Sequence, residues 1–128
     1  MFNTSALRRD GSRGGRAPAT ESEAMTVNHI LQYVQRCAGH DLRPDEGVHH
    51  GSSRAEVKGV TVCWMATPAA IRAAADHGDN LIIAHESLYY PYGVTDGADD
   101  PPGWPDWPVN AARRQRLERY GITVVRLH

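Results

Sequence analysis

Apolar side chains recur near the start of the chain at the spacing of one helix face, at Val27, Ile30, Leu31, Val34, Cys37 and Ala38. Side chains at i, i+3, i+4 and i+7 line the same side of an α-helix. Thr26 stands before this stretch as a favourable N-cap, and Gly39 follows it as a residue that readily ends a helix. The pattern predicts an amphipathic helix over residues 26–38 and a polar loop over residues 40–54.

Two apolar runs in the middle of the chain have the composition of β-strands. Residues 57–65 are dense in Val with Thr, Cys and Trp, and residues 81–84 are continuously apolar, as expected for a strand covered on both faces. Between them, Thr67 and Pro68 favour the start of a helix and Gly78 favours its end. The pattern predicts a strand, a helix and a second strand in that order.

The last third of the chain repeats this order after an interruption. Residues 91–108 hold five of the eight prolines and predict a long irregular excursion. Residues 109–120 predict a helix whose Arg-rich face is turned outward, and Gly121 ends it before a β-branched final strand. The order β-α-β-loop-α-β favours a mainly parallel, right-handed sheet in a three-layer α/β fold.

The two ends of the chain differ from this pattern. The first 24 residues are rich in Gly, Ser, Arg and Ala, so we expect a disordered extension, and they lack the apolar stretch of a signal peptide. The chain stops at His128, directly after an apolar strand, whereas natural termini usually continue past their last element. We therefore expect one folded unit over residues 25–128 that is truncated at its C-terminal end.

The composition excludes several function classes. The 14 basic and 15 acidic side chains give a net charge of −1, which removes any general electrostatic case for binding nucleic acid or an anionic membrane. No apolar run approaches the roughly 18 residues of a membrane span. Cys37 and Cys63 are too few for a disulfide scaffold and fit a reducing compartment. We expect a soluble, cytoplasmic protein.

The carboxyl ends of the predicted strands carry the candidate chemistry. In a parallel sheet these ends meet at one edge, where ligands gather, and here they bring His85, Glu86 and His128 together. Neighbouring strands lie about 4.8 Å apart, so side chains from two of them can share a metal ion whose bonds are about 2 Å long. His85 and Glu86 can both reach one ion only if the backbone turns there. The alternative is that these histidines are structural and merely hydrogen-bonded.

The remaining candidates are weaker. His49 and His50 form a pair in the predicted loop, where histidines are usually solvated, and His29, His40 and His77 have no partner at ligand spacing. Five aromatic residues lie around the proline-rich excursion, where they either line a pocket or, as we favour, anchor the excursion onto the domain or onto a partner subunit: Tyr89, Tyr90, Tyr92, Trp104 and Trp107. The chain has no glycine-rich phosphate loop, Cys-x-x-Cys pair or Gly-x-Ser-x-Gly elbow.

Residues 57–67 and 74–90 resemble the dinuclear metal centre family, whose members are usually called Nif-three-like. The shared features are a strand ending near Ala66-Thr67, a helix leading through Gly-Asp-Asn to Leu-Ile-Ile, and His85-Glu86 followed by two tyrosines. The closing Gly-Ile-Thr-Val-Val-Arg-Leu-His run is similar to the strand that ends on the next ligand of the family. The resemblance covers residues 25–128, the N-terminal part of a family member.

The resemblance implies a metal site. His85 matches the first ligand of the family, Glu86 stands where many members have a second histidine, and His128 matches the histidine that opens the next ligand motif. A complete site holds two divalent ions (zinc, iron or manganese), and its distal ligands lie beyond the end of this chain. The family also implies self-association into a ring-type homo-oligomer, a hexamer.

Three functions remain open at the level of sequence. The first is a metal-dependent hydrolase that uses metal-activated water on a small-molecule substrate that these residues do not identify. The others are a non-catalytic metal-binding or scaffold module and an inactive fragment. Asp96 and His77 are the nearest candidates for an acid or base, and nothing here supports the name type-two GTP cyclohydrolase I that some members carry. A chain that ends on its last strand is expected to expose that strand as an unpaired apolar edge, which predicts poor solubility or misassociation.

Overall fold

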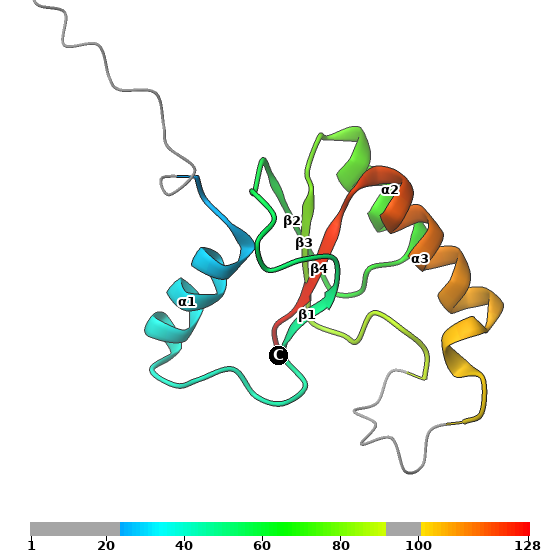
Figure 1. Cartoon of the computed structure of the whole chain (residues 1–128), viewed down its shortest axis with the longest axis horizontal. Coiled ribbons are helices and arrows are strands. Elements are labelled where there is room, and N and C mark those ends of the chain that lie inside the picture. Colours follow the sequence, from blue (N-terminus) through cyan, green and yellow to red (C-terminus); the bar gives the residue numbers. More distant parts are fainter. Residues whose placement is uncertain (1–23, 92–100) are drawn as a thin grey trace, which may run out of the picture.

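The computed structural model describes residues 24–91 and 101–128 (Figure 1). The elements follow in the order α1 (Val27–Ala38), β1 (Gly47–His50), β2 (Val60–Cys63), α2 (Pro68–Asp76), β3 (Leu81–Ala84), the short 3-10 helix η2 (Trp104–Asp106), α3 (Pro108–Tyr120) and β4 (Thr123–Arg126). The predicted N-terminal extension, apart from residue 24, lies outside the described residues. The same holds for residues 92–100 of the predicted excursion, including Tyr92 and Asp96.

The four strands form one sheet in the order β1-β4-β3-β2. Strands β2, β3 and β4 run parallel, with Leu81 paired to Thr123 and Ala84 to Arg126 across the two central strands. The α/β fold class and the mainly parallel order predicted from the sequence are therefore confirmed.

Strand β1 corrects the expectation that residues 40–54 form only a loop. It pairs antiparallel with β4, with Gly47 opposite Arg126. Because β4 lies between β1 and β3, the expectation that the last strand exposes an unpaired apolar edge is wrong. Gly47 and Gly51 flank the strand with φ of 116° and 90°, and the backbone of Thr123 packs so close to Gly51 that a Cβ there would lie 2.9 Å from its Cα atom. The positive φ favours glycine at both positions, and the close approach of Thr123 additionally excludes a side chain at Gly51.

The sheet is covered on both faces, as a three-layer fold requires (Figure 1). Helices α2 and α3 pack on one face, against alternate residues of the central strands such as Ile82 and Val124. Helix α1 packs on the other face, against Leu81 and Val125. Successive strand residues point to opposite faces, so both central strands are apolar throughout their buried length apart from Thr123 and Arg126.

The predicted helix caps are confirmed. The Thr26 side chain accepts a hydrogen bond from the backbone N–H of His29 at 3.3 Å, and the His29 ring accepts one from the backbone N–H of Thr26 at 3.1 Å. The two residues form a capping box in which histidine takes the place of the usual glutamate. Thr67 caps α2 by a single bond, since its side chain accepts a hydrogen bond from the backbone N–H of Ala70 at 3.1 Å.

The outward face predicted for the arginines of α3 is wrong for Arg113. Its side chain is buried, and its Nη1 atom donates to the carbonyl oxygen of Leu88 at 2.7 Å. Beside it, buried Asn110 hydrogen-bonds both backbone groups of Tyr90 and the carbonyl oxygen of Trp104. The ring of Tyr90, before the excursion, also contacts the ring of Trp107, after it, at a centroid distance of 5.8 Å. These contacts agree with the interpretation that the aromatic residues anchor the excursion.

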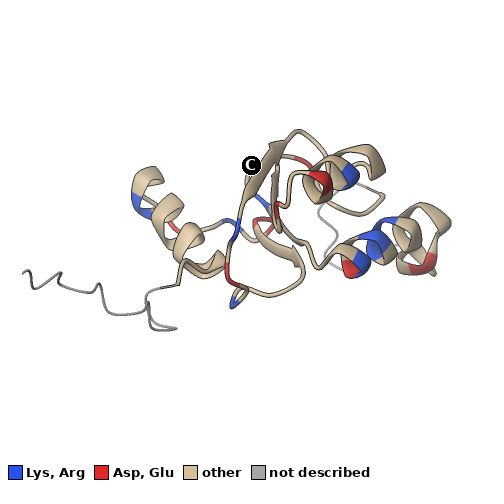
Figure 2. Cartoon of the chain, turned by 90° about the horizontal axis from the view of Figure 1, so that it is seen from above, with Lys and Arg blue, Asp and Glu red and all other residues tan. Residues whose placement is uncertain are grey.

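Charges of both signs are interspersed along α2 and α3 (Figure 2). Arg72 pairs with Asp76 at 3.3 Å on α2, and Arg114 on α3 pairs with Asp106 at 3.5 Å. Among the described helices, none is long and apolar enough to cross a membrane.

Replacing Leu117 by Ala is expected to lower the free energy of unfolding by about 2–5 kcal/mol, because the side chain is fully buried between α3 and the sheet and its removal leaves a cavity. Val109→Ala, at a side chain that is 40% exposed, is the matched control and should cost far less. Urea denaturation measures both. Equal losses in the two variants would contradict the packing described above.

Candidate functional site

The pairing of β3 with β4 brings the predicted site residues to one edge of the sheet. Ala84 and Arg126 are paired at the ends of these strands, and the backbone N–H of Leu127 donates to the Ala84 carbonyl oxygen at 3.0 Å, which extends the alignment by one residue. The rings of His85 and His128 consequently meet edge to face, with their centroids 4.7 Å apart. The structure thus brings together two of the three predicted ligands from different strands.

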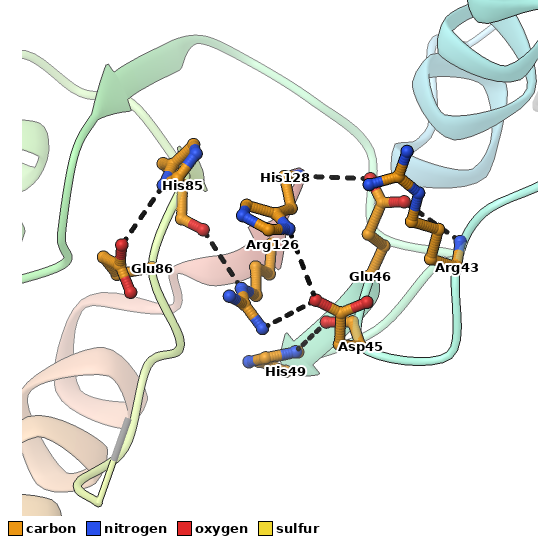
Figure 3. Close-up of polar contacts among 8 residues, drawn as sticks. All are labelled: Arg43, Asp45, Glu46, His49, His85, Glu86, Arg126 and His128. Carbon is orange, nitrogen blue, oxygen red and sulfur yellow. Dashed lines mark hydrogen bonds and ion pairs between the residues drawn. The ribbon is translucent and has the colours of Figure 1, made fainter. Parts of the chain in front are cut away.

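The third predicted ligand, Glu86, lies beside His85. Its Oε1 atom is 3.3 Å from Nδ1 of His85 (Figure 3). The backbone turns at this point, because the N–H groups of both residues donate to the carbonyl oxygen of Trp64, at 3.1 and 2.9 Å. This turn is the condition under which two consecutive side chains can serve one site. The indole of Trp64 stacks on the His85 ring at 4.0 Å and covers one of its faces.

Two acidic residues that the sequence analysis missed hold His128. Glu46 accepts the backbone N–H of His128 at 3.1 Å through Oε2 and the N–H of Arg43 at 3.0 Å through Oε1. Burial raises the pKa of Glu46, but these two hydrogen bonds outweigh it and bring the pKa below its ordinary value. Asp45 Oδ2 lies 3.8 Å from Nδ1 of His128, an electrostatic contact (Figure 3).

Arg126 connects His85 to Asp45, the carboxylate that lies near His128, through its buried guanidinium. Its side chain is 7% exposed, its Nε atom donates to the carbonyl oxygen of His85 at 3.0 Å, and its Nη1 atom forms an ion pair with Asp45 Oδ2 at 2.9 Å. The available signals in the sequence were an acidic pair just before Gly47 and a lone arginine in an apolar strand. Neither signal indicates a contact with the site until the pairing of β1 with β4 is known.

The other histidines have structural contacts. His49 Nε2 lies 3.1 Å from the carbonyl oxygen of Asp45, and His50 Nδ1 lies 3.4 Å from the Tyr89 hydroxyl. Burial lowers the pKa of both rings. His77 caps the C-terminus of α2 just before β3 begins, so it lies at the opposite edge of the sheet from His85 and is too far away to act there as an acid or base.

The donor set of His85 and Glu86 fits a metal ion. Imidazole nitrogen and carboxylate oxygen are ligands that zinc, iron and manganese take, and the Nδ1–Oε1 separation of 3.3 Å is that of a hydrogen bond or ion pair between the two side chains. Within residues 24–91 and 101–128, however, no three His, Cys, Asp or Glu side chains are arranged to enclose an ion. The assignment of His85, Glu86 and His128 as one ligand set stays a prediction.

The fold is similar to part of several longer solved structures. The Staphylococcus aureus protein SA1388 matches with a TM-score of 0.61 and 17% identity, over 84% of this chain and 29% of that chain. A Bacillus cereus protein related to NIF3 matches with a TM-score of 0.60 and 17% identity, over 82% and 28%. Reduced HcgD from Methanocaldococcus jannaschii matches with a TM-score of 0.61 and 16% identity, over 81% and 40%. No family model and no curated protein matches the chain.

These comparisons confirm the Nif-three-like fold that the sequence motifs predicted. They also show that the chain spans less than half the length of the structures it resembles, between 28% and 40% for the three named here.

Acidification is expected to destabilise the fold through His49 and His50. Their folded pKa values lie below the ordinary 6.5, so unfolding takes up protons as the pH falls through and below 6.5, while the stabilisation is complete above it. Replacing both histidines by Gln should reduce the shift in the urea midpoint between about pH 7.5 and about pH 5.5. An undiminished shift in the double variant would show that other groups cause the pH dependence.

Proposed function

We propose that His85, Glu86 and His128 are the ligands that this chain supplies to a divalent metal centre. The observation that supports this best is the convergence, at the carboxyl edge of the parallel strands, of a carboxylate–imidazole pair 3.3 Å apart and a second imidazole whose ring contacts the first. Imidazole and carboxylate suit zinc, iron or manganese. In the complete centre of the family that the motifs resemble there are two such ions, and the further ligands would come from outside residues 25–128.

The chemistry best suited to this edge is hydrolysis of a small molecule. A divalent ion with an open position lowers the pKa of its bound water toward about 7 and stabilises negative charge that develops in the reaction. The protein contributes a rigid and partly exposed setting: Trp64 covers one face of the His85 ring, and Glu46 holds the backbone of His128.

Both cysteines are free thiols, which supports a cytoplasmic location.

Metal analysis of the purified protein tests the ligand assignment. His85→Ala and His128→Ala are each expected to lower the affinity for zinc or manganese about tenfold or more, and Glu86→Gln should weaken binding while keeping the shape of the side chain. His77→Ala, at the opposite edge of the sheet, should leave binding unchanged and serves as the control. Equal metal content in all four variants and the parent would contradict the assignment of these residues as ligands.

An assembly module is the second candidate function, and an exposed apolar strip favours it. Val60 and Val62 are alternate residues of edge strand β2 and Trp64 follows the strand, and the three side chains are 40%, 75% and 65% exposed. Val60 and Val62 pair in register with Leu81 and Ile83, so they lie on the face that α1 covers only in part. An edge strand without proline or charge is open to pairing with another chain. We propose that ring-type self-association uses this strip.

Light scattering after size exclusion tests this assembly. Val62→Lys is expected to reduce the mass of the oligomer at micromolar concentration, because it places a charge in the centre of the apolar strip. Val109→Lys makes the same change at an exposed valine on α3 and should leave the mass unchanged. A parent protein that is monomeric, or a Val62→Lys variant with the parental mass, would contradict self-association through β2.

A further inference from the structure

Arg126 carries a buried charge next to the candidate metal centre. It is the last residue of β4, and its side chain is 7% exposed. Burying a guanidinium is costly unless its charge is paired, and Nη1 of Arg126 has an ion pair with Asp45 but no hydrogen bond. Two of its contacts are specific to this site, since Nε donates to the backbone carbonyl of His85 at 3.0 Å and Nη1 pairs with Asp45.

Asp45 connects the same guanidinium to the second histidine. A single carboxylate oxygen, Oδ2, lies 2.9 Å from Arg126 Nη1 and 3.8 Å from His128 Nδ1 (Figure 3). A carboxylate facing Nδ1 favours the imidazole tautomer that carries its proton there, and the unprotonated Nε2 is then the nitrogen able to bind a ligand. No hydrogen bond in the described part of the chain uses Nε2 of His128 or of His85.

We propose that Asp45 and Arg126 form a positioning pair for the metal centre, an inference that rests on the proposed function. Arg126 holds the backbone of His85 at the end of β3. Asp45 selects the tautomer of His128 and holds the guanidinium in place. The continuous chain of contacts from the His85 carbonyl through Arg126 and Asp45 to the His128 ring fixes how the two imidazoles face each other.

A purely structural role makes a different prediction. Gly47 is paired with Arg126, and Asp45 lies just before β1, so the ion pair could serve only to fasten β1 to β4. In that case its removal lowers stability and leaves the tautomer of His128 and the metal affinity of the folded fraction unchanged. The ring nitrogens of His128 therefore distinguish the two roles.

The experiment compares two site variants with the parent protein and one control. Nitrogen-15 NMR of the metal-free protein reports the tautomer of His128, and titration with Co²⁺ reports affinity and the absorption spectrum of the bound ion. Asp45→Asn is expected to abolish the preference for the Nδ1–H tautomer and to weaken Co²⁺ binding about 10–100-fold. Asp76→Asn removes a carboxylate from the exposed Arg72–Asp76 pair and should change neither measurement.

Arg126→Lys is the second variant, because Asp45→Asn leaves a buried guanidinium without its counter-charge and can unfold the protein. Lysine keeps a positive charge opposite Asp45 but lacks the rigid fork that reaches two partners. We expect the His128 tautomer to be kept, the carbonyl carbon shift of His85 to change, and Co²⁺ binding to weaken about tenfold.

The outcomes separate this inference from the proposed function. If the parent binds Co²⁺ and both folded variants bind it within a factor of two, the positioning role is overturned while the metal site stands. If the parent binds no Co²⁺, the proposed function fails, and the metal-free NMR still decides the positioning role. A His128 ring without the Nδ1–H preference in the parent, or with the same preference in Asp45→Asn, would overturn it.

Discussion

The parallel pairing of β3 with β4 is the constraint on which the rest of the structure depends. Because Ala84 and Arg126 are aligned at the ends of these strands, the chain segments that follow them leave the sheet at the same edge. The same two strands bury alternate side chains against α1 on one face and against α2 and α3 on the other. One register therefore sets both the core and the juxtaposition of His85 with His128.

Local features of the chain were predictable from sequence because they depend on neighbouring residues. The amphipathic pattern of α1 with its Thr26 cap, the Thr67-Pro68 start of α2 and the apolar run of β3 all carry short-range signals. Strand β1 carries no such signal, since Gly-Val-His-His has a single apolar side chain, begins with a glycine and is followed by another. The burial of Arg113 was equally invisible, because its partner, the Leu88 carbonyl, lies 25 residues away.

The residues of the candidate site also fall into a group that was predictable from sequence and a group that was not. His85, Glu86 and His128 could be named from sequence because parallel strands end at a common edge, and that geometry follows from the order of elements alone. Asp45, Glu46 and Arg126 could not be named, because their contacts exist only after β1 has paired with β4. Sequence order thus locates the histidines, whereas the long-range closure of the sheet determines what surrounds them.

Strand β1 has a consequence for the dynamics of the molecule. It has four residues and lies at the edge of the sheet, where we expect an element to open locally before the protein unfolds. Opening it withdraws Asp45 from Arg126 and Glu46 from His128. Any ligand that binds only the assembled edge must therefore hold β1 closed, and occupancy of the histidines and protection of β1 from hydrogen exchange are reciprocally linked.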